Sequence, residues 1–199
     1  MTGEFAVILR GTEDRSQGPG IVHLTARPGA AVVGEHFHPN MIELFTVVSG
    51  RLDASIAGKI FSLEPSQSAT VEAGVVHDWW NSSRTDEAHV LIEIERAQGA
   101  DHIDPNRFEL LIGMLFGLAN AGRVDKKGKP FLLQAAVIAR EFADVIVFTQ
   151  PPPAVQRVAL AILAPLASLL GYRAIDPDFC RPHAHVTPAP EILALVAER

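Results

Sequence analysis

The pattern of hydrophobic and polar residues changes character near the middle of the chain. In the first half, short runs of alternating or β-branched residues are separated by turn residues, as is typical of strands. In 51–56, for example, Leu52, Ala54 and Ile56 share one face, and polar residues take the other. Such spacing predicts a β-sandwich or a small β-barrel. About eight strands are expected, at residues 5–9, 21–26, 43–48, 51–56, 59–63, 69–71, 77–81 and 89–95.

Two dipeptides that end in glycine are predicted to be hairpin turns. Ser49-Gly50 separates the run at 43–48 from the next one, and Ala57-Gly58 separates 51–56 from 59–63. Both connections are short, and glycine readily adopts the positive φ that tight hairpin turns require.

The second half of the chain follows a helical period instead. Between Phe108 and Ala119, apolar residues recur every three or four positions, and Gly122 is expected to end this helix. The change of period divides the chain into a predicted β-rich domain, residues 1–97, and an α-helical extension, residues 98–199. Further helices are predicted at residues 131–148, 154–170 and 191–197.

The predicted helices are apolar on more than one face. A helix of this kind must bury two faces, one against the β-domain and another against a helix or a second chain. We therefore expect a homodimer that forms through the helical extension.

Charge is divided in the same way as the hydrophobic pattern. Residues 1–97 contain seven basic and thirteen acidic residues, a formal charge of −6, whereas residues 98–199 contain ten of each. Nucleic-acid binding requires a basic surface, so no nucleic-acid partner is expected. The N-terminus lacks the features of a signal peptide, and no apolar segment reaches the about 18–20 residues of a membrane span. With one cysteine, which allows no internal disulfide, these features predict a cytoplasmic protein.

A cluster of ligand-type residues stands out in the first half. On a strand, His36 and His38 point to the same face, because side chains alternate with a period of two. Glu43 follows after one tight connection, and His77 comes directly after a predicted turn. Three imidazoles and a carboxylate suit a divalent Fe, Mn, Ni, Co or Zn ion. The sequence thus predicts a mononuclear metal site that leaves coordination positions open for a small molecule.

The spacing of these residues resembles the two motifs of the cupin superfamily. The first motif corresponds to His36, His38, Glu43 and Gly50, and the second to Gly74, His77 and Asn81, with these intervals met. The resemblance covers roughly residues 1–97. It implies a double-stranded β-helix barrel of the jelly-roll type, in which His36, His38, Glu43 and His77 bind the metal.

The chain departs from those motifs at three turn positions. Ala30 and Ser66 stand where the motifs have glycine, and Glu72 stands where the second motif has proline. These departures concern the shape of loops and leave the ligand residues intact.

Two functions are compatible with this sequence. The first is a metal-dependent reaction on a small organic molecule, either dioxygenase-like or isomerase-like, for which no catalytic side chain beyond the ligands is assigned. The alternative is a non-catalytic module that binds a metal or a metabolite and recruits a partner through its helices.

Two neighbours of His77 also have two interpretations. Trp79 is expected to be a pocket wall or a core residue, and Asn81 to orient a ligand or cap a strand end.

Overall fold

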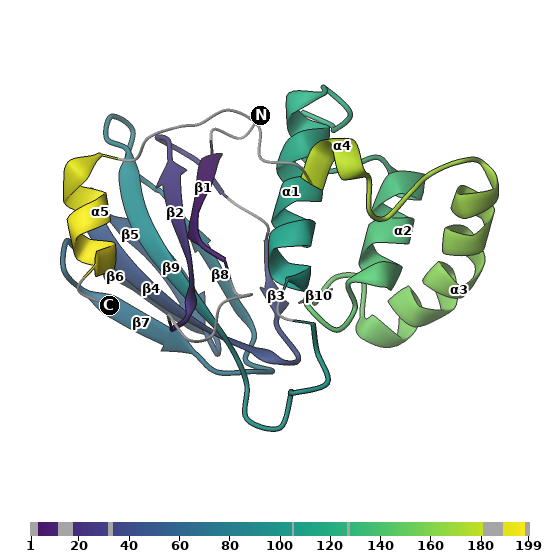
Figure 1. Ribbon diagram of the computed structural model, residues 1–199, viewed down its shortest axis with the longest axis horizontal. Coiled ribbons are helices and arrows are strands. Elements are labelled where there is room, and N and C mark those ends of the chain that lie inside the picture. The colour runs from purple at the N-terminus through teal and green to yellow at the C-terminus, as the bar shows by residue number, and fades with distance from the viewer. Residues whose placement is uncertain are drawn as a thin grey trace.

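Two five-stranded antiparallel sheets are followed by a helical region (Figure 1). The computed structural model describes residues 4–11, 18–31, 34–104, 106–126, 128–180 and 189–197. A mainly-β fold with a helical C-terminal region, as expected from the sequence, is thus confirmed. The first sheet has the order β1 (Glu4–Arg10), β2 (Gly20–Ala26), β9 (Ala88–Arg96), β4 (Met41–Ser49) and β7 (Ser68–Val71). The second has the order β10 (Val147–Phe148), β3 (His36–Phe37), β8 (His77–Trp80), β5 (Leu52–Ile56) and β6 (Lys59–Leu63).

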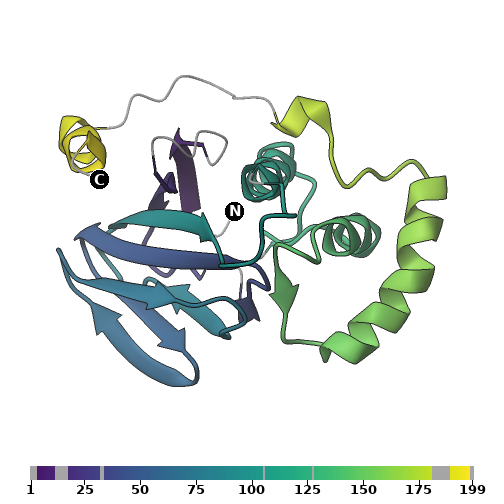
Figure 2. The same cartoon turned by 60° about the horizontal axis from the view of Figure 1, so that its bottom comes forward.

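The helices lie mostly to one side of the sheets. In Figure 2, α1 and α2 lie next to the sheets and α3 lies on the outer side of α2, whereas α5 is on the opposite side. Ile192 of α5 packs there with Ile21 of β2 and Leu91 of β9. Among the described helices, none is both long and apolar enough to cross a membrane. Their bounds are α1 (Arg107–Asn120), α2 (Leu132–Glu141), α3 (Pro153–Leu169), α4 (Pro177–Cys180) and α5 (Pro190–Ala197).

The larger of two hydrophobic clusters runs from the sheets into the helical region. Phe45 and Trp79 from the sheets belong to the same buried cluster as Phe108 of α1 and Phe142, which follows α2. Burial of such side chains contributes about 1.5–3 kcal/mol each. The boundary between residues 97 and 98 stays a prediction, and the core itself is continuous across that position.

The predicted helix at 131–148 is wrong in its second half. Helix α2 ends at Glu141, and Val147–Phe148 instead form β10, which pairs with β3. The segment after Glu141 is rich in β-branched and aromatic residues, which lose side-chain freedom in a helix and fit a sheet. Pairing with β3 provides backbone hydrogen bonds that replace those of the helix. Tertiary structure therefore decides that residues 147–148 form a strand and not a helix.

One of the two predicted hairpin turns is a corner between the sheets. Ala57-Gly58 does connect a hairpin, β5–β6, and both residues have positive φ, 51° and 77°. Ser49-Gly50, by contrast, leads from β4 in the first sheet to β5 in the second. The prediction of a hairpin there is wrong because the two strands take different partners: β4 pairs with β7 and β9, and β5 with β6 and β8.

The corner at Gly50 requires glycine for two reasons. Its φ is 75°, and a Cβ atom there would lie 2.2 Å from the carbonyl oxygen of Glu87 and 2.9 Å from Cα of Ala88. Gly58 has a similar φ of 77°, but no heavy atom lies within 4 Å of an added Cβ. Comparing substitutions at these two glycines therefore separates the cost of a positive φ, which both share, from the cost of the steric clash, which only Gly50 has.

We predict that Gly50→Ala destabilises the protein much more than Gly58→Ala does. The matched variant Gly58→Ala should cost only the strain of positive φ, about 1–2 kcal/mol. Gly50→Ala should cost at least about 2 kcal/mol more, because the backbone of residues 87–88 must move. Urea denaturation of both variants measures the difference, and equal free energies of unfolding would contradict this account of the corner.

Candidate metal centre

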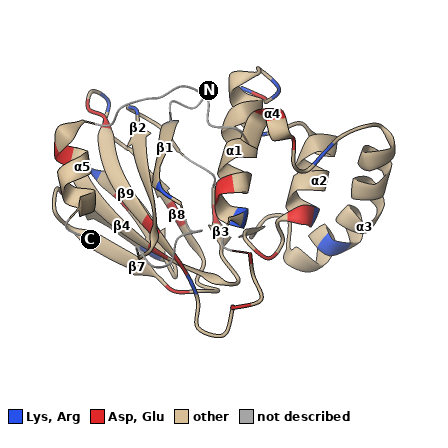
Figure 3. Ribbon diagram, viewed as in Figure 1, with Lys and Arg blue, Asp and Glu red and all other residues tan. Residues whose placement is uncertain are grey.

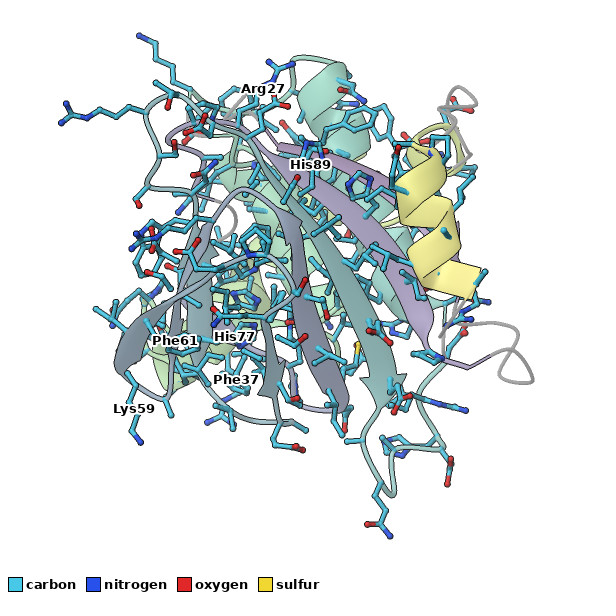
Figure 4. All side chains as sticks on the ribbon, turned by 90° about the vertical axis from the view of Figure 1, so that its left-hand side faces the viewer. Arg27, Phe37, Lys59, Phe61, His77 and His89 are labelled. Atoms are coloured by element: carbon cyan, nitrogen blue, oxygen red, sulfur yellow. The ribbon has the colours of Figure 1, made fainter. Side chains whose placement is uncertain are left out.

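Strand pairing brings two histidines of the second sheet together. In the β3–β8 ladder His36 lies directly opposite His77, and their ring centroids are 4.3 Å apart. His38 follows β3 by one residue, and its ring centroid is 4.9 Å from that of His36. Figure 4 shows His77 among the strands, whereas the side chain of Lys59 projects outward.

The carboxylate comes from the facing sheet. Burial alternates along β4, so that Met41, Glu43 and Phe45 point inward while Ile42 and Leu44 are only half-buried. The Oε1 atom of Glu43 lies 3.4 Å from Nε2 of His38, and Oε2 lies 3.0 Å from Nε2 of His77. The sheets thus face each other across a cluster of three imidazoles and one carboxylate.

A backbone carbonyl holds the far side of each imidazole. The Nδ1 atoms of His36 and His77 donate to the carbonyl oxygens of Gly34 and Val75, at 2.7 Å and 3.0 Å. The Nδ1 atom of His38 donates to the carbonyl oxygen of Val145, at 2.6 Å. A carbonyl oxygen can only accept, so Nδ1 carries the proton in each neutral ring and Nε2 keeps its lone pair. Such partners commonly orient metal-ligating histidines.

The cluster fits a metal ion. One ligand atom from each of His36, His38, Glu43 and His77 lies within 4.8 Å of the others, and all four residues are buried. Nε2 of His38 and His77 and Oε2 of Glu43 are buried without a hydrogen-bond partner, although Glu43 lies within ion-pair distance of both rings. Unpartnered buried polar atoms are costly. A cation placed among them would remove that cost.

Electrostatics favours the protonation states that metal binding needs at Glu43 and His36, whereas at His38 a metal ion would have to displace a proton. Burial, and then the neighbouring imidazoles of His38 and His77, lower the pKa of His36 to about 4. Burial acts to raise the pKa of Glu43, but the adjacent His38 and His77 outweigh it and hold that pKa well below its usual range. Burial acts to lower the pKa of His38, and the Glu43 carboxylate raises it above the ordinary value. At neutral pH, Glu43 is therefore an anion and His36 is neutral, which suits both as metal ligands.

Comparison with known families supports the same interpretation of the β-rich half. Residues 22–94 match the family model described as "Cupin domain". These residues form a cupin domain. The superfamily resemblance that the two motifs carry is confirmed over this range, which contains all four clustered residues.

Solved structures similar to the cupin domain cover about half of this chain. The cupin domain of an XRE family transcriptional regulator from Enterobacter cloacae is 23% identical, with a TM-score of 0.42, covering 48% of this chain and 99% of that one. A predicted oxalate decarboxylase from Thermotoga maritima is 19% identical, with a TM-score of 0.44 and coverage of 47% and 81%. A sugar phosphate isomerase from Silicibacter pomeroyi is 22% identical, with a TM-score of 0.41 and coverage of 49% and 62%. No curated protein matches the chain.

The structure brings all four predicted ligand residues together and resolves the interpretation of two neighbours. Trp79 lies in the core, 6.1 Å from Phe45 between ring centroids. Asn81 stabilises the loop after β8: its Nδ2 donates to the carbonyl oxygens of Ala26 and Asp86, both at 2.8 Å, and its Oδ1 accepts from the Ser83 amide. The structural role expected for Asn81 is therefore the one that its contacts support.

Sequence reasoning missed the contribution of the helical region to the cupin site. Besides the Val145 carbonyl, the rings of Phe108 and Phe148 lie near the cluster, with centroids 6.1 Å from His38 and 6.2 Å from His36. Both rings come from beyond the matched residues 22–94. No motif marks these residues: Phe148 is brought to the cluster by the pairing of β10 with β3, and Phe108 by the packing of α1.

We predict that Asn81→Ala destabilises the protein and leaves metal affinity unchanged. The substitution removes three hydrogen bonds of a buried side chain and leaves two carbonyl groups and an amide without it, so a loss of about 2–4 kcal/mol is expected. Chemical denaturation measures the stability, and a metal titration measures the affinity. As a control, the exposed Asn120→Ala should change stability by less than about 0.5 kcal/mol. Weaker metal binding by folded Asn81→Ala would show that Asn81 belongs to the site.

Proposed function

We propose that the protein binds one divalent metal ion through His36, His38, Glu43 and His77 and acts on a small organic molecule there. The observation that carries this proposal is the convergence of three oriented imidazoles and a carboxylate in one buried space. This ligand set suits Fe, Mn, Co, Ni or Zn. When bound, such an ion supplies Lewis-acid chemistry, polarising an oxygen of the small molecule. Dioxygenase-like and isomerase-like reactions both fit this chemistry.

In this proposal the residues of the chain hold and screen the ion. Glu43 supplies negative charge from the first sheet, while the imidazoles supply nitrogen donors whose far nitrogens are fixed by carbonyl groups. Phe108 and Phe148 cover the cluster with apolar surface, which excludes water and strengthens electrostatic interactions inside. We also infer that the two sheets close into the jelly-roll barrel that the cupin resemblance implies.

A non-catalytic metal- or metabolite-binding module is the second candidate. It is favoured by the deep burial of the cluster, in which Glu43 is only 4% exposed and His77 only 1%. A closed coordination sphere would leave no position for a substrate. Water exchange at a bound paramagnetic ion discriminates the two: fast relaxation of bulk water by Mn²⁺-loaded protein favours catalysis, and its absence favours the binding module.

The metal proposal predicts that purified protein contains near-stoichiometric metal, and that a His36→Ala, His77→Ala double variant contains none. Each substitution removes one imidazole from the buried cluster, and the remaining two ligands bind a divalent ion weakly. Elemental analysis of protein purified without chelator measures the metal content. A His23→Ala, His89→Ala variant is the matched control, because these two histidines contact each other away from the cluster. Metal retained in His36→Ala, His77→Ala would overturn the proposed site.

We further propose that two copies of the chain associate through helix α3. Its only charged residue is Arg157, and the rest of the helix is uncharged (Figure 3). One stripe of large apolar side chains is exposed on it, and such a stripe lacks a partner within the described residues. Contiguous exposed apolar surface of this kind marks interaction sites. The stripe consists of Val155, Val158, Ile162, Leu166 and Leu169.

The α3 proposal predicts that the wild-type protein sediments as a dimer and that Ile162→Glu sediments as a monomer. Ile162 is 67% exposed at the middle of the stripe, so a carboxylate there would be buried in the interface at a high cost. Ile60→Glu, at a residue 75% exposed on β6, is the matched control and should remain a dimer. A monomeric wild-type protein would refute the interface.

The cytoplasmic location and the absence of a nucleic-acid partner stay predictions.

A further inference from the structure

One of the clustered histidines is oriented in a different way from the other two. His36 and His77 each donate to a carbonyl only two residues earlier in the chain, so their orientation is set locally. His38 donates to Val145, 107 residues later, through the shortest of these bonds, 2.6 Å. The orientation of His38 thus depends on where the helical region places one carbonyl group.

The turn that carries this carbonyl follows α2. The amides of Val145 and Ile146 both donate to the carbonyl of Phe142, at 2.9 Å, and so form a tight turn. Asn40, two residues after His38, donates from Nδ2 to the carbonyl of Asp144 at 2.9 Å. Asn40 therefore gives the cupin strand region a second connection to the turn, next to the His38–Val145 bond.

Arg107, at the start of α1, clamps the same turn. Its Nη2 donates a hydrogen bond to Oδ1 of Asp144 at 2.8 Å, and its Nε lies 2.7 Å from Oδ2 of the same carboxylate as an ion pair. It also donates to the side chain of Glu141 at 3.1 Å and to the Glu141 carbonyl, and its Cζ lies 5.1 Å from the ring centroid of Phe142. A partly buried guanidinium that contacts a carboxylate, a second acidic side chain, a carbonyl and an aromatic ring fixes geometry far better than a single contact does.

We propose that Arg107, acting with Asp144, is a positioning residue for the metal centre. It holds the turn so that the Val145 carbonyl keeps Nε2 of His38 directed at the other ligands. The helical region thereby becomes part of the cupin site and does more than cover it. This inference rests on the proposed metal binding by His36, His38, Glu43 and His77.

Two effects follow from this arrangement and separate it from a purely structural role. Loosening the turn lowers metal affinity, because the His38 ring loses its fixed orientation; loss of an outer partner of a ligand typically lowers affinity 10–100-fold. By reciprocity, metal binding must stabilise the turn and slow hydrogen exchange of the amides at 142–149. A residue that only supports the fold would change neither metal affinity nor metal-dependent protection.

The test titrates Co²⁺ into full-length metal-free protein and follows Kd and the visible Co²⁺ spectrum. Arg107→Lys, which keeps the charge but loses the planar group that contacts both Asp144 and Glu141, and Asp144→Asn should each raise Kd by at least about tenfold and alter the spectrum. Arg123→Gln is the matched control: Arg123 also lies over an aromatic ring, that of Phe179, at 5.9 Å, and it should keep the wild-type Kd. Hydrogen exchange with and without Co²⁺ measures the protection of 142–149.

The outcomes distinguish the failure of this inference from that of the metal proposal. Wild-type Kd in folded Arg107→Lys and Asp144→Asn, with unchanged spectra, would overturn the positioning role and leave the metal proposal standing. A wild-type protein that binds no Co²⁺ would overturn both. If the Arg107 variant does not fold, Asn40→Ala removes a single anchor of the same turn, and an unchanged Kd in that variant would overturn the inference.

Discussion

A carboxylate buried between two sheets is the constraint around which the rest of this structure is arranged. Removing the charge of Glu43 from water is costly, and in the protein alone it is offset by the imidazoles beside it. Those imidazoles have their outer nitrogens bonded to carbonyl groups, so their inner nitrogens all face the same small space. A divalent cation would balance both the charge and the unpartnered atoms.

That constraint explains why the helical region packs where it does. A buried polar cluster must be surrounded by other side chains that keep water out, and the cupin strands supply only some of these side chains. Strand β10 extends the second sheet next to His36, while α1 contributes Phe108 near His38. The continuous core and the Arg107 clamp make these side chains part of one packed unit. The extension and the cupin domain therefore both contact the four clustered residues.

The sequence was sufficient to predict which four residues cluster but not the parts that orient them. The spacing of His36, His38, Glu43 and His77 is a local property, because alternation along strands and short turns decide which way each points. The acceptor of His38 comes from Val145, and its clamp from Arg107, and nothing in the residues near either one marks that role. Long-range contacts of this kind depend on tertiary packing.

The same limit explains the errors in secondary structure. The periodicity of segment 142–148 does not distinguish a helix from a strand, and pairing with the edge of β3 places residues 147–148 in a strand. Likewise, Ser49-Gly50 has the composition of a hairpin turn, yet the strands on either side belong to different sheets. A local pattern predicts that a turn exists; which strands it joins is set by the rest of the fold.

The central claim is that one divalent metal ion sits among the four clustered residues and that the helical region encloses it. Anomalous diffraction from crystals of the metal-loaded protein tests this most directly. The account predicts a single anomalous peak in the space bounded by His36, His38, Glu43 and His77, with the Val145 carbonyl still bonded to His38. A peak elsewhere, or no peak in protein shown to contain metal, would contradict it.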